Sequence, residues 1–173
     1  VIQDTIDLVK KNRNIDVVFD KEMNDKNVFK LWQEGNSVGI FQFESQGMTN
    51  FMRELKPDSL EDIIAGVSLY RPGPMDQIPR YIANKKDPEH AIYTHPALKP
   101  ILEVTYGCMV YQEQVMQIVR DLAGYSLGRA DLVRRAMGKK KLDVMEKERA
   151  VFINGQVDEN GNVEVPGCVR NGI

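Results

Sequence analysis

The sequence of 173 residues predicts a mainly α-helical domain with a few short β-strands. Its clearest segment, residues 112–123, places apolar residues at the spacing of one helix face and is followed by Gly124. Other apolar segments begin after Asp or Ser, which are good helix N-caps, whereas the candidate strands are short. With 42% apolar residues and no internal repeat, the chain can form a real hydrophobic core.

Four helices are predicted in the N-terminal part of the chain. Asp25, Ser45 and Ser59 are the expected N-caps of the last three, and Gly35 is the expected end of the second helix. The four helices cover residues 1–11, 26–34, 48–55 and 60–69. Between them, residues 12–20 are predicted to form a connector, and the short apolar and aromatic segment 38–43 is predicted to form a strand.

Prolines interrupt the next part of the chain. Pro72, Pro74 and Pro79 predict an ordered turn or loop over residues 70–79. A short helix is predicted over residues 81–87, and His95-Pro96 predicts another helix start, because proline is favoured at the first helical position.

The C-terminal part is predicted to contain three helices and the remaining strands. Residues 107–111 form a candidate second strand, and Asn160-Gly161 predicts a hairpin turn between Val157 and residues 163–165. The three helices cover residues 112–123, residues 129–137 with Gly138 as the C-cap, and residues 142–153.

Positive charge is concentrated between Arg129 and Lys141. This window contains six basic side chains and a single acid, whereas the whole chain has 23 basic and 25 acidic side chains. The six are Arg129, Arg134, Arg135, Lys139, Lys140 and Lys141. An otherwise acidic chain therefore has one positive site, which suits an anionic ligand such as a triphosphate or a nucleic-acid backbone.

On a helix, Arg134 and Arg135 point away from the apolar stripe, about 100° apart. That stripe consists of Ala130, Val133 and Met137, with Ala136 beside it. Two neighbouring guanidinium groups suit a polyphosphate, because each can donate two charge-assisted hydrogen bonds.

Two ordinary explanations of this charge remain open. Asp131 precedes the arginines by three and four residues, so it can form a surface ion pair with either one. Lysines near the end of a helix also complement its dipole. One acid cannot neutralise six bases, however, so phosphate binding is the favoured interpretation.

The sequence argues against several other classes of protein, including membrane-spanning and secreted proteins. No segment approaches the roughly 20 apolar residues of a membrane helix, and no signal peptide opens the chain. Cys108 and Cys168 lie 60 positions apart and are interpreted as reduced thiols of a cytosolic protein. His90 and His95 are expected to cap helices or to be solvated. The chain begins with Val and already reads as helix there, and it stops at Gly172-Ile173 without a tail, so both ends are expected to be cuts through a larger protein.

Four segments in order carry a resemblance to a known family. They are Gly-Ile-Phe-Gln-Phe-Glu-Ser at 39–45, Ser-Leu-Tyr-Arg-Pro-Gly-Pro-Met at 68–75, Tyr-Gln-Glu-Gln-Val-Met at 111–116 and Leu-Val-Arg-Arg-Ala-Met-Gly-Lys-Lys at 132–140. With them the chain closely resembles the α subunits of bacterial DNA polymerase III, the replicative family-C polymerases. The similarity spans residues 1–155 and extends to the tail at 167–173. It implies a helical fingers domain cut from a larger multidomain polymerase.

The resemblance implies roles for particular residues. Arg134 and Arg135 match an arginine pair that contacts the triphosphate of the incoming dNTP, and Lys139 and Lys140 match lysines close to the same site. Further candidates for the nucleotide or DNA cleft are Arg71, Pro72, Gly73, Pro74, Lys141 and Arg129. Tyr70 and Tyr125 are interpreted as buried aromatics rather than base-stacking residues. Gln112, Glu113 and Gln114 can equally be polar residues of a helix N-terminus with no ligand.

Catalysis is expected to depend on residues outside this chain. Nucleotidyl transfer uses two divalent metals held by clustered carboxylates, and the sequence has no Asp-x-Asp. Asp4 and Asp7 are interpreted as surface acids of a helix. The resemblance places the catalytic aspartates in the palm, before Val1, and they would hold Mg²⁺ in the intact polymerase. We therefore predict no catalytic or metal-binding residue here and expect the chain alone not to polymerise.

The resemblance also implies an organisation and a set of partners. Residues 1–36 would connect palm and fingers, residues 37–155 would form the fingers core, and residues 156–173 would lead into the rest of the polymerase. The expected partners are dNTP and primer–template DNA, with a sliding clamp and a clamp loader contacting regions outside this chain. No membrane contact is expected, and the expected location is the bacterial cytoplasm.

Two other functions are compatible with the same basic patch. A non-catalytic helical module could bind the nucleic-acid backbone through it, with a steep salt dependence. The three lysines at 139–141 could alternatively dock an acidic protein, but docking would not require the Arg-Pro-Gly-Pro segment.

Overall fold

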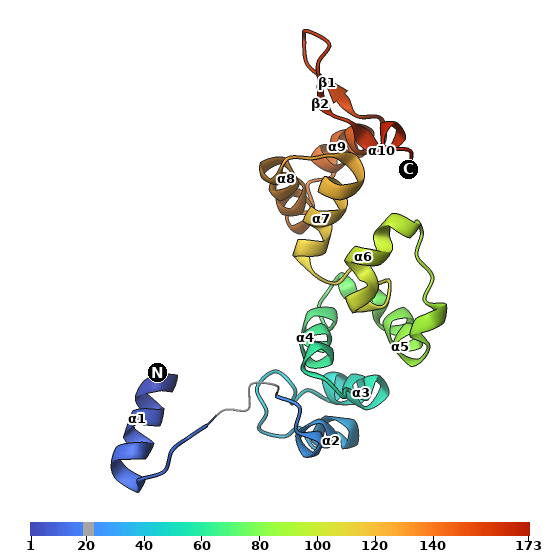
Figure 1. Ribbon diagram of the computed structural model, residues 1–173. Coiled ribbons are helices and arrows are strands. Elements are labelled where there is room, and N and C mark those ends of the chain that lie inside the picture. Colours follow the sequence, from blue (N-terminus) through green and yellow to red (C-terminus); the bar gives the residue numbers. More distant parts are fainter. Residues whose placement is uncertain (19–22) are drawn as a thin grey trace. The chain divides into compact units, whose positions relative to one another are not determined.

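The computed structural model describes residues 1–18 and 23–173 (Figure 1). In these residues it contains ten α-helices, four short 3-10 helices and one two-stranded sheet, which confirms the mainly α fold class. The contacts divide the chain into two compact units, Val1–Gly66 and Val67–Ile173. The predicted connector at 12–20 is only partly testable, because residues 19 and 20 lie outside the described residues and residues 12 and 13 belong to the first helix.

The first unit is built from short helices whose starts are set by local side chains. Asp25 accepts a hydrogen bond from the Asn27 amide at 2.8 Å, and Ser45 Oγ accepts one from the Met48 amide at 3.2 Å. Both N-caps were predicted, and the predicted end at Gly35 is confirmed by its φ of 76°. The helices are α1 (Ile2–Arg13), α2 (Lys26–Glu34), α3 (Gln46–Leu55) and α4 (Leu60–Leu69), the last of which continues into the second unit.

The strand predicted at 38–43 is wrong, because this segment forms consecutive turns. The Phe43 amide donates to the Ile40 carbonyl at 3.0 Å, and Gly39 and Gln42 have φ values of 80° and 69°. Ser37 Oγ also donates to the Phe43 carbonyl at 2.7 Å and closes the loop. Left-handed residues at two positions prevent the extended backbone that a strand requires.

The core of the first unit is aromatic and sulfur-rich. The Trp32 ring lies 6.3 Å from the Phe29 ring and 5.4 Å from the Phe43 ring, measured between centroids. The buried apolar side chains of this unit include Phe29, Phe43, Met48, Phe51, Met52 and Leu55. Helix α1, in contrast, has no buried residue.

The second unit begins with the end of α4, and the predicted ordered turn or loop is confirmed only at residues 70–73. Residues 70–79 contain the 3-10 helix η1 (Pro74–Gln77) and the start of α5 (Ile78–Lys86), because proline is compatible with the first turn of a helix. The helix predicted at 81–87 therefore starts three residues early. The predicted start at His95 is confirmed, since its Nδ1 accepts from the Ala97 amide at 3.2 Å. The remaining elements here are η2 (Pro88–His90), η3 (Pro96–Leu98), α6 (Lys99–Leu102) and η4 (Glu103–Thr105).

The strand predicted at 107–111 is also wrong, because its backbone groups bind neighbouring side chains. Thr105 Oγ1 donates to the Cys108 carbonyl at 2.6 Å. Gln114 Oε1 accepts from the Val110 and Tyr111 amides at 2.8 and 2.9 Å. These local bonds replace those that a partner strand would supply.

The C-terminal part packs three long helices around one apolar core. They are α7 (Gln112–Ala123), α8 (Leu127–Gly138) and α9 (Leu142–Asn154), followed by β1 (Gln156–Val157), β2 (Val163–Val165) and α10 (Gly167–Arg170). The strands pair antiparallel, as the predicted hairpin requires. The buried core residues are Ile101, Leu102, Val119, Leu122, Ala123, Tyr125, Ala130, Val133, Val165 and Cys168. Among the described residues, no helix has the length and apolar character to cross a membrane.

Candidate functional site

Helix α8 presents Arg135 on the side away from its buried stripe and Arg134, half-buried, beside that stripe. Ser126 Oγ accepts from the Arg129 amide at 3.3 Å and fixes the start of the helix. The apolar stripe is buried as predicted at Ala130, Val133 and Ala136, while Met137 at its end is 38% exposed. Burial of this face fixes the rotation of the helix, so Arg135 lies on its outer side and Arg134 lies at the border of the buried face.

Arg134 and Arg135 converge on one carboxylate. The Arg134 Nη2 and Asp131 Oδ1 atoms lie 2.7 Å apart, and the Arg135 Nη2 and Asp131 Oδ2 atoms also lie 2.7 Å apart. The hydrogen bond from Arg134, aided by the charges of both arginines, lowers the pKa of Asp131. The ion pairs that the spacing allowed are therefore formed, and they hold the two guanidinium groups side by side. One carboxylate balances only one of the two charges.

The two arginines differ in how firmly they are held. Arg134 also donates through Nε to Asp131 Oδ1 and through Nη1 to Gln112 Oε1, both at 2.8 Å. Its side chain is 28% exposed, whereas that of Arg135 is 62% exposed. Arg135 therefore has more N–H groups available to a ligand. The contact with Gln112 was not predicted, because 22 residues separate it from Arg134.

The three lysines form the tight turn between α8 and α9. Lys140 has a φ of 52°, and the Lys141 amide donates to the Ala136 carbonyl at 3.0 Å. This is a Schellman-type end in which Lys140 takes the left-handed position. The predicted C-cap at Gly138 is thus wrong, since Gly138 is the last helical residue and Lys139 is the cap. In the described part of the chain, all three lysines are exposed and none forms an ion pair.

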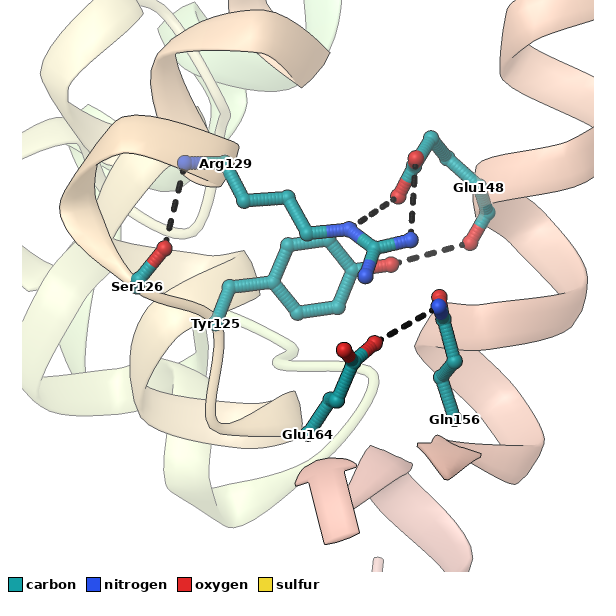
Figure 2. Close-up of polar contacts among 6 residues, drawn as sticks. All are labelled: Tyr125, Ser126, Arg129, Glu148, Gln156 and Glu164. Atoms are coloured by element: carbon teal, nitrogen blue, oxygen red, sulfur yellow. Dashed lines mark hydrogen bonds and ion pairs between the residues drawn. The ribbon is translucent and has the colours of Figure 1, made fainter. Parts of the chain in front are cut away.

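Arg129 is engaged inside the protein, as Figure 2 shows. Its Nε and Nη2 donate to the two Glu148 carboxylate oxygens at 3.1 and 3.2 Å, and its guanidinium lies 5.1 Å from the centre of the Tyr125 ring. Tyr125, which is 3% exposed, donates to the Glu148 carbonyl at 3.1 Å. Burial raises the pKa of the Tyr125 hydroxyl. Arg129 therefore links α8 to α9, and its charge is compensated by Glu148.

The segment Arg71 to Pro74 lies in the turn that leads into η1. Gly73 has a φ of 116°, and the Met75 amide donates to the Arg71 carbonyl at 3.2 Å. Arg71 is exposed, and within residues 1–18 and 23–173 its guanidinium takes part in no hydrogen bond or ion pair. No such contact joins this turn to the arginine pair. The structure thus brings together Arg134 and Arg135 but does not connect Arg71 to them.

An apolar pocket between α7, α8 and α9 does not suit a phosphate. It measures about 360 Å³ and is lined mainly by apolar side chains of α7, α8 and α9, among them Val133 and Met137 of the buried stripe. A triphosphate requires convergent cations, and neither Arg134 nor Arg135 lines this pocket. We therefore place the candidate anion site at the exposed arginine pair rather than in this pocket.

The described residues do not fit a divalent-metal centre. They contain no group of three or more His, Cys, Asp and Glu side chains that could hold a metal ion. His90 forms a hydrogen bond with Asp87 at 2.8 Å, and this contact raises the pKa of His90. Burial raises the pKa of the thiols of Cys108 and Cys168, so both are poor ligands.

Comparisons with known proteins agree with the sequence motifs. The bacterial DNA polymerase III alpha subunit finger domain family matches residues 1–160. The chain is 47% identical over 162 residues to DNA polymerase III subunit alpha of Staphylococcus aureus (strain COL) and 50% identical over 161 residues to that of Rickettsia bellii (strain RML369-C). These matches cover 93% and 92% of this chain but only 15% and 14% of the relatives. The chain therefore belongs to the family of bacterial DNA polymerase III alpha subunit finger domains.

Proposed function

We propose that this finger domain binds the triphosphate of the incoming dNTP while the intact protein synthesises DNA on a template. The observation that supports this most is the meeting of two guanidinium groups on the single carboxylate of Asp131. One positive charge remains uncompensated there, at the exposed surface of α8. The names of the relatives, DNA polymerase III subunit alpha, supply the reaction in which such a site would act.

Arg135 is the main phosphate contact in this proposal. It uses one nitrogen on Asp131 and is 62% exposed, so most of its five N–H donors can reach a ligand. Arg134 would contribute charge and its remaining donors from a more fixed position. Cations that are aligned before the nucleotide arrives bind its triphosphate without having to reorganise.

Lys139 and Lys140 would act as mobile charges beside the arginines. Both follow α8 directly, and neither forms an ion pair among the residues that the structure describes. A lysine ammonium is a compact charge on a flexible stem and can follow a phosphate as it moves. Lys141 and Arg71 remain secondary candidates for contacts with nucleotide or DNA, whereas the pairing of Arg129 with Glu148 supports a structural role for that residue.

The rest of the reaction is assigned to parts of the polymerase outside this chain. Two divalent metals, which we propose to be Mg²⁺, would be held there by clustered carboxylates. The rest of the polymerase would likewise bind most of the primer–template DNA, the sliding clamp and the clamp loader.

The test is the Arg135→Ala substitution in the intact polymerase. Loss of a charge-assisted hydrogen bond costs about 1.5–3 kcal/mol, so the KM for dNTP should rise roughly 10- to 100-fold in primer extension. The matched control is Arg120→Ala, because Arg120 lies on α7 and is paired with Asp121. An unchanged KM together with a lower melting temperature would mean that Arg135 is structural and would overturn the proposal.

Backbone binding by a helical module is the second candidate function, and the exposed lysine turn favours it. The affinity of a phosphate-tracking patch for oligonucleotides falls steeply with salt, because each neutralised phosphate adds about 0.9 to the logarithmic slope. A nucleotide site should instead prefer a dNTP to the matching monophosphate. Measuring both ligands on the intact polymerase and on its Arg135→Ala variant separates the two functions.

A further inference from the structure

We propose that Gln112 is a positioning residue for this site, which holds Arg134 so that the arginine pair is ordered before the nucleotide arrives. The inference rests on the proposed function and deepens it. Gln112 would not touch the triphosphate itself. It would act through Arg134, from a different helix.

The geometry places Arg134 between two acceptors. Gln112 Oε1 accepts from Nη1 at 2.8 Å, and Asp131 Oδ1 lies 2.8 Å from Nε and 2.7 Å from Nη2. All three nitrogens of the guanidinium are therefore held, two from α8 and one from α7. An arginine side chain loses rotamer entropy when it is fixed. In this arrangement that loss occurs on folding and not on nucleotide binding.

The backbone position of Gln112 is fixed, because hydrogen bonds of Gln114 hold the start of α7 in place. Gln114 is 3% exposed, and its Oε1 accepts from the Val110 and Tyr111 amides. Its Nε2 donates to Thr105 Oγ1 at 2.8 Å, which ties the start of α7 to η4. The two glutamines of Gln-Glu-Gln thus have separate tasks. The buried one fixes the helix, and the exposed one holds the arginine.

The proposed role requires an uncharged hydrogen-bond acceptor at position 112. Asp131 already balances one of the two arginine charges. A second carboxylate at position 112 would hold Arg134 equally well but would cancel the remaining charge that attracts phosphate. The amide oxygen of Gln112 orients the guanidinium without neutralising it.

The experiment compares Gln112→Ala with Gln117→Ala in the intact polymerase by primer extension. Gln117 is an exposed glutamine of the same helix and forms no side-chain hydrogen bond in the described part of the chain, so it serves as the matched control. We expect Gln112→Ala to raise the KM for dNTP about three- to tenfold, with kcat nearly unchanged, because it loosens binding rather than chemistry. Gln112→Glu should also raise the KM, and in this variant the rise should shrink at high salt.

A double-mutant cycle with Arg134→Ala shows whether Gln112 acts through that arginine. If it does, adding Gln112→Ala to Arg134→Ala changes the KM no further. Full additivity, or a KM for Gln112→Ala equal to that of Gln117→Ala, would overturn the inference while leaving the proposed function intact. If Arg134→Ala and Arg135→Ala both leave the KM unchanged, the proposed function and this inference fail together.

Discussion

Asp131 is the residue whose ionisation the arginine pair controls most directly. It lies within 2.7 Å of one nitrogen of each arginine, and its pKa is lowered first by the hydrogen bond from Arg134 and then by the two positive charges. A carboxylate with a lowered pKa in the folded chain favours folding above its unfolded pKa. That contribution is lost as the pH falls through the folded pKa. The pH dependence of this contribution is therefore confined to acidic pH, from the ordinary pKa of an aspartate downwards, and Asp131 stays charged near neutrality.

We predict that Arg134→Ala raises the pKa of Asp131 towards its ordinary value, and that Arg135→Ala raises it less, because Arg134 supplies the leading hydrogen bond. Carbon-13 NMR titration of the carboxyl groups in the 173-residue chain measures this. Asp158 is the internal control, since its pKa is lowered by Asn162 and should stay low in both variants. A pKa of Asp131 that is the same in all three chains would show that the ion pairs do not persist in solution.

At the scale of elements, the contacts of Glu148 join α8 to α9 (Figure 2). The side chains of Arg129 and Glu148 are 23% and 19% exposed, so removing the carboxylate charge leaves a largely desolvated guanidinium unpaired. We predict that Glu148→Gln lowers the free energy of unfolding by about 1–3 kcal/mol. Glu164→Gln is the matched control, because Glu164 is exposed and bonds only the neutral Gln156 within the described residues.

The chain contains its own probes for this measurement. All six tyrosines lie in Val67–Ile173, and the single tryptophan, Trp32, lies in Val1–Gly66. In urea, Glu148→Gln should shift the transition reported by tyrosine fluorescence and leave the tryptophan-reported one in place. An unshifted tyrosine transition would mean that the ion pair adds nothing to the stability of the α8–α9 junction.

The helices were predictable because their ends are set locally. Asp25 and Ser45 bind amides two and three residues ahead, which a sequence pattern can reveal. The strands at 38–43 and 107–111 were wrong because an apolar segment does not show whether a partner strand exists. In the second segment, the side chains of Thr105 and Gln114 form the backbone hydrogen bonds that a partner strand would otherwise form. The hairpin succeeded because its turn chemistry is local.

In the candidate site, too, contacts between residues close in sequence were predictable, whereas contacts that depend on helix packing were not. The ion pairs of Asp131 with the two arginines follow from spacings of three and four residues on a helix. Gln112 and Glu148 lie 22 and 19 residues from the arginines that they bind, and only helix packing brings them together. The sequence therefore predicted which cations gather at α8 but not which of them remain available to a ligand.

At the scale of the whole molecule, we expect nucleotide binding and catalysis to depend on different parts of the polymerase. The chain spans 15% of the length of its Staphylococcus aureus relative, and in the part that the structure describes no cluster of acids could hold the two metals of nucleotidyl transfer. The exposed arginine pair, in contrast, lies entirely within α8 and needs only α7 to hold it. We therefore expect this chain to hold an anion without being able to join it to a primer.

We therefore predict that the purified 173-residue chain incorporates no labelled dNTP into a primer–template in the presence of Mg²⁺, under conditions in which the intact polymerase does. The same chain should still bind a dNTP more tightly than the matching monophosphate, and Arg135→Ala should remove that preference, because the charge that distinguishes the two ligands lies at the arginine pair. Equilibrium binding and primer extension on one preparation measure both properties. Incorporation by the chain that disappears when one of its own aspartates or glutamates is changed to alanine would show that it contains a catalytic centre after all.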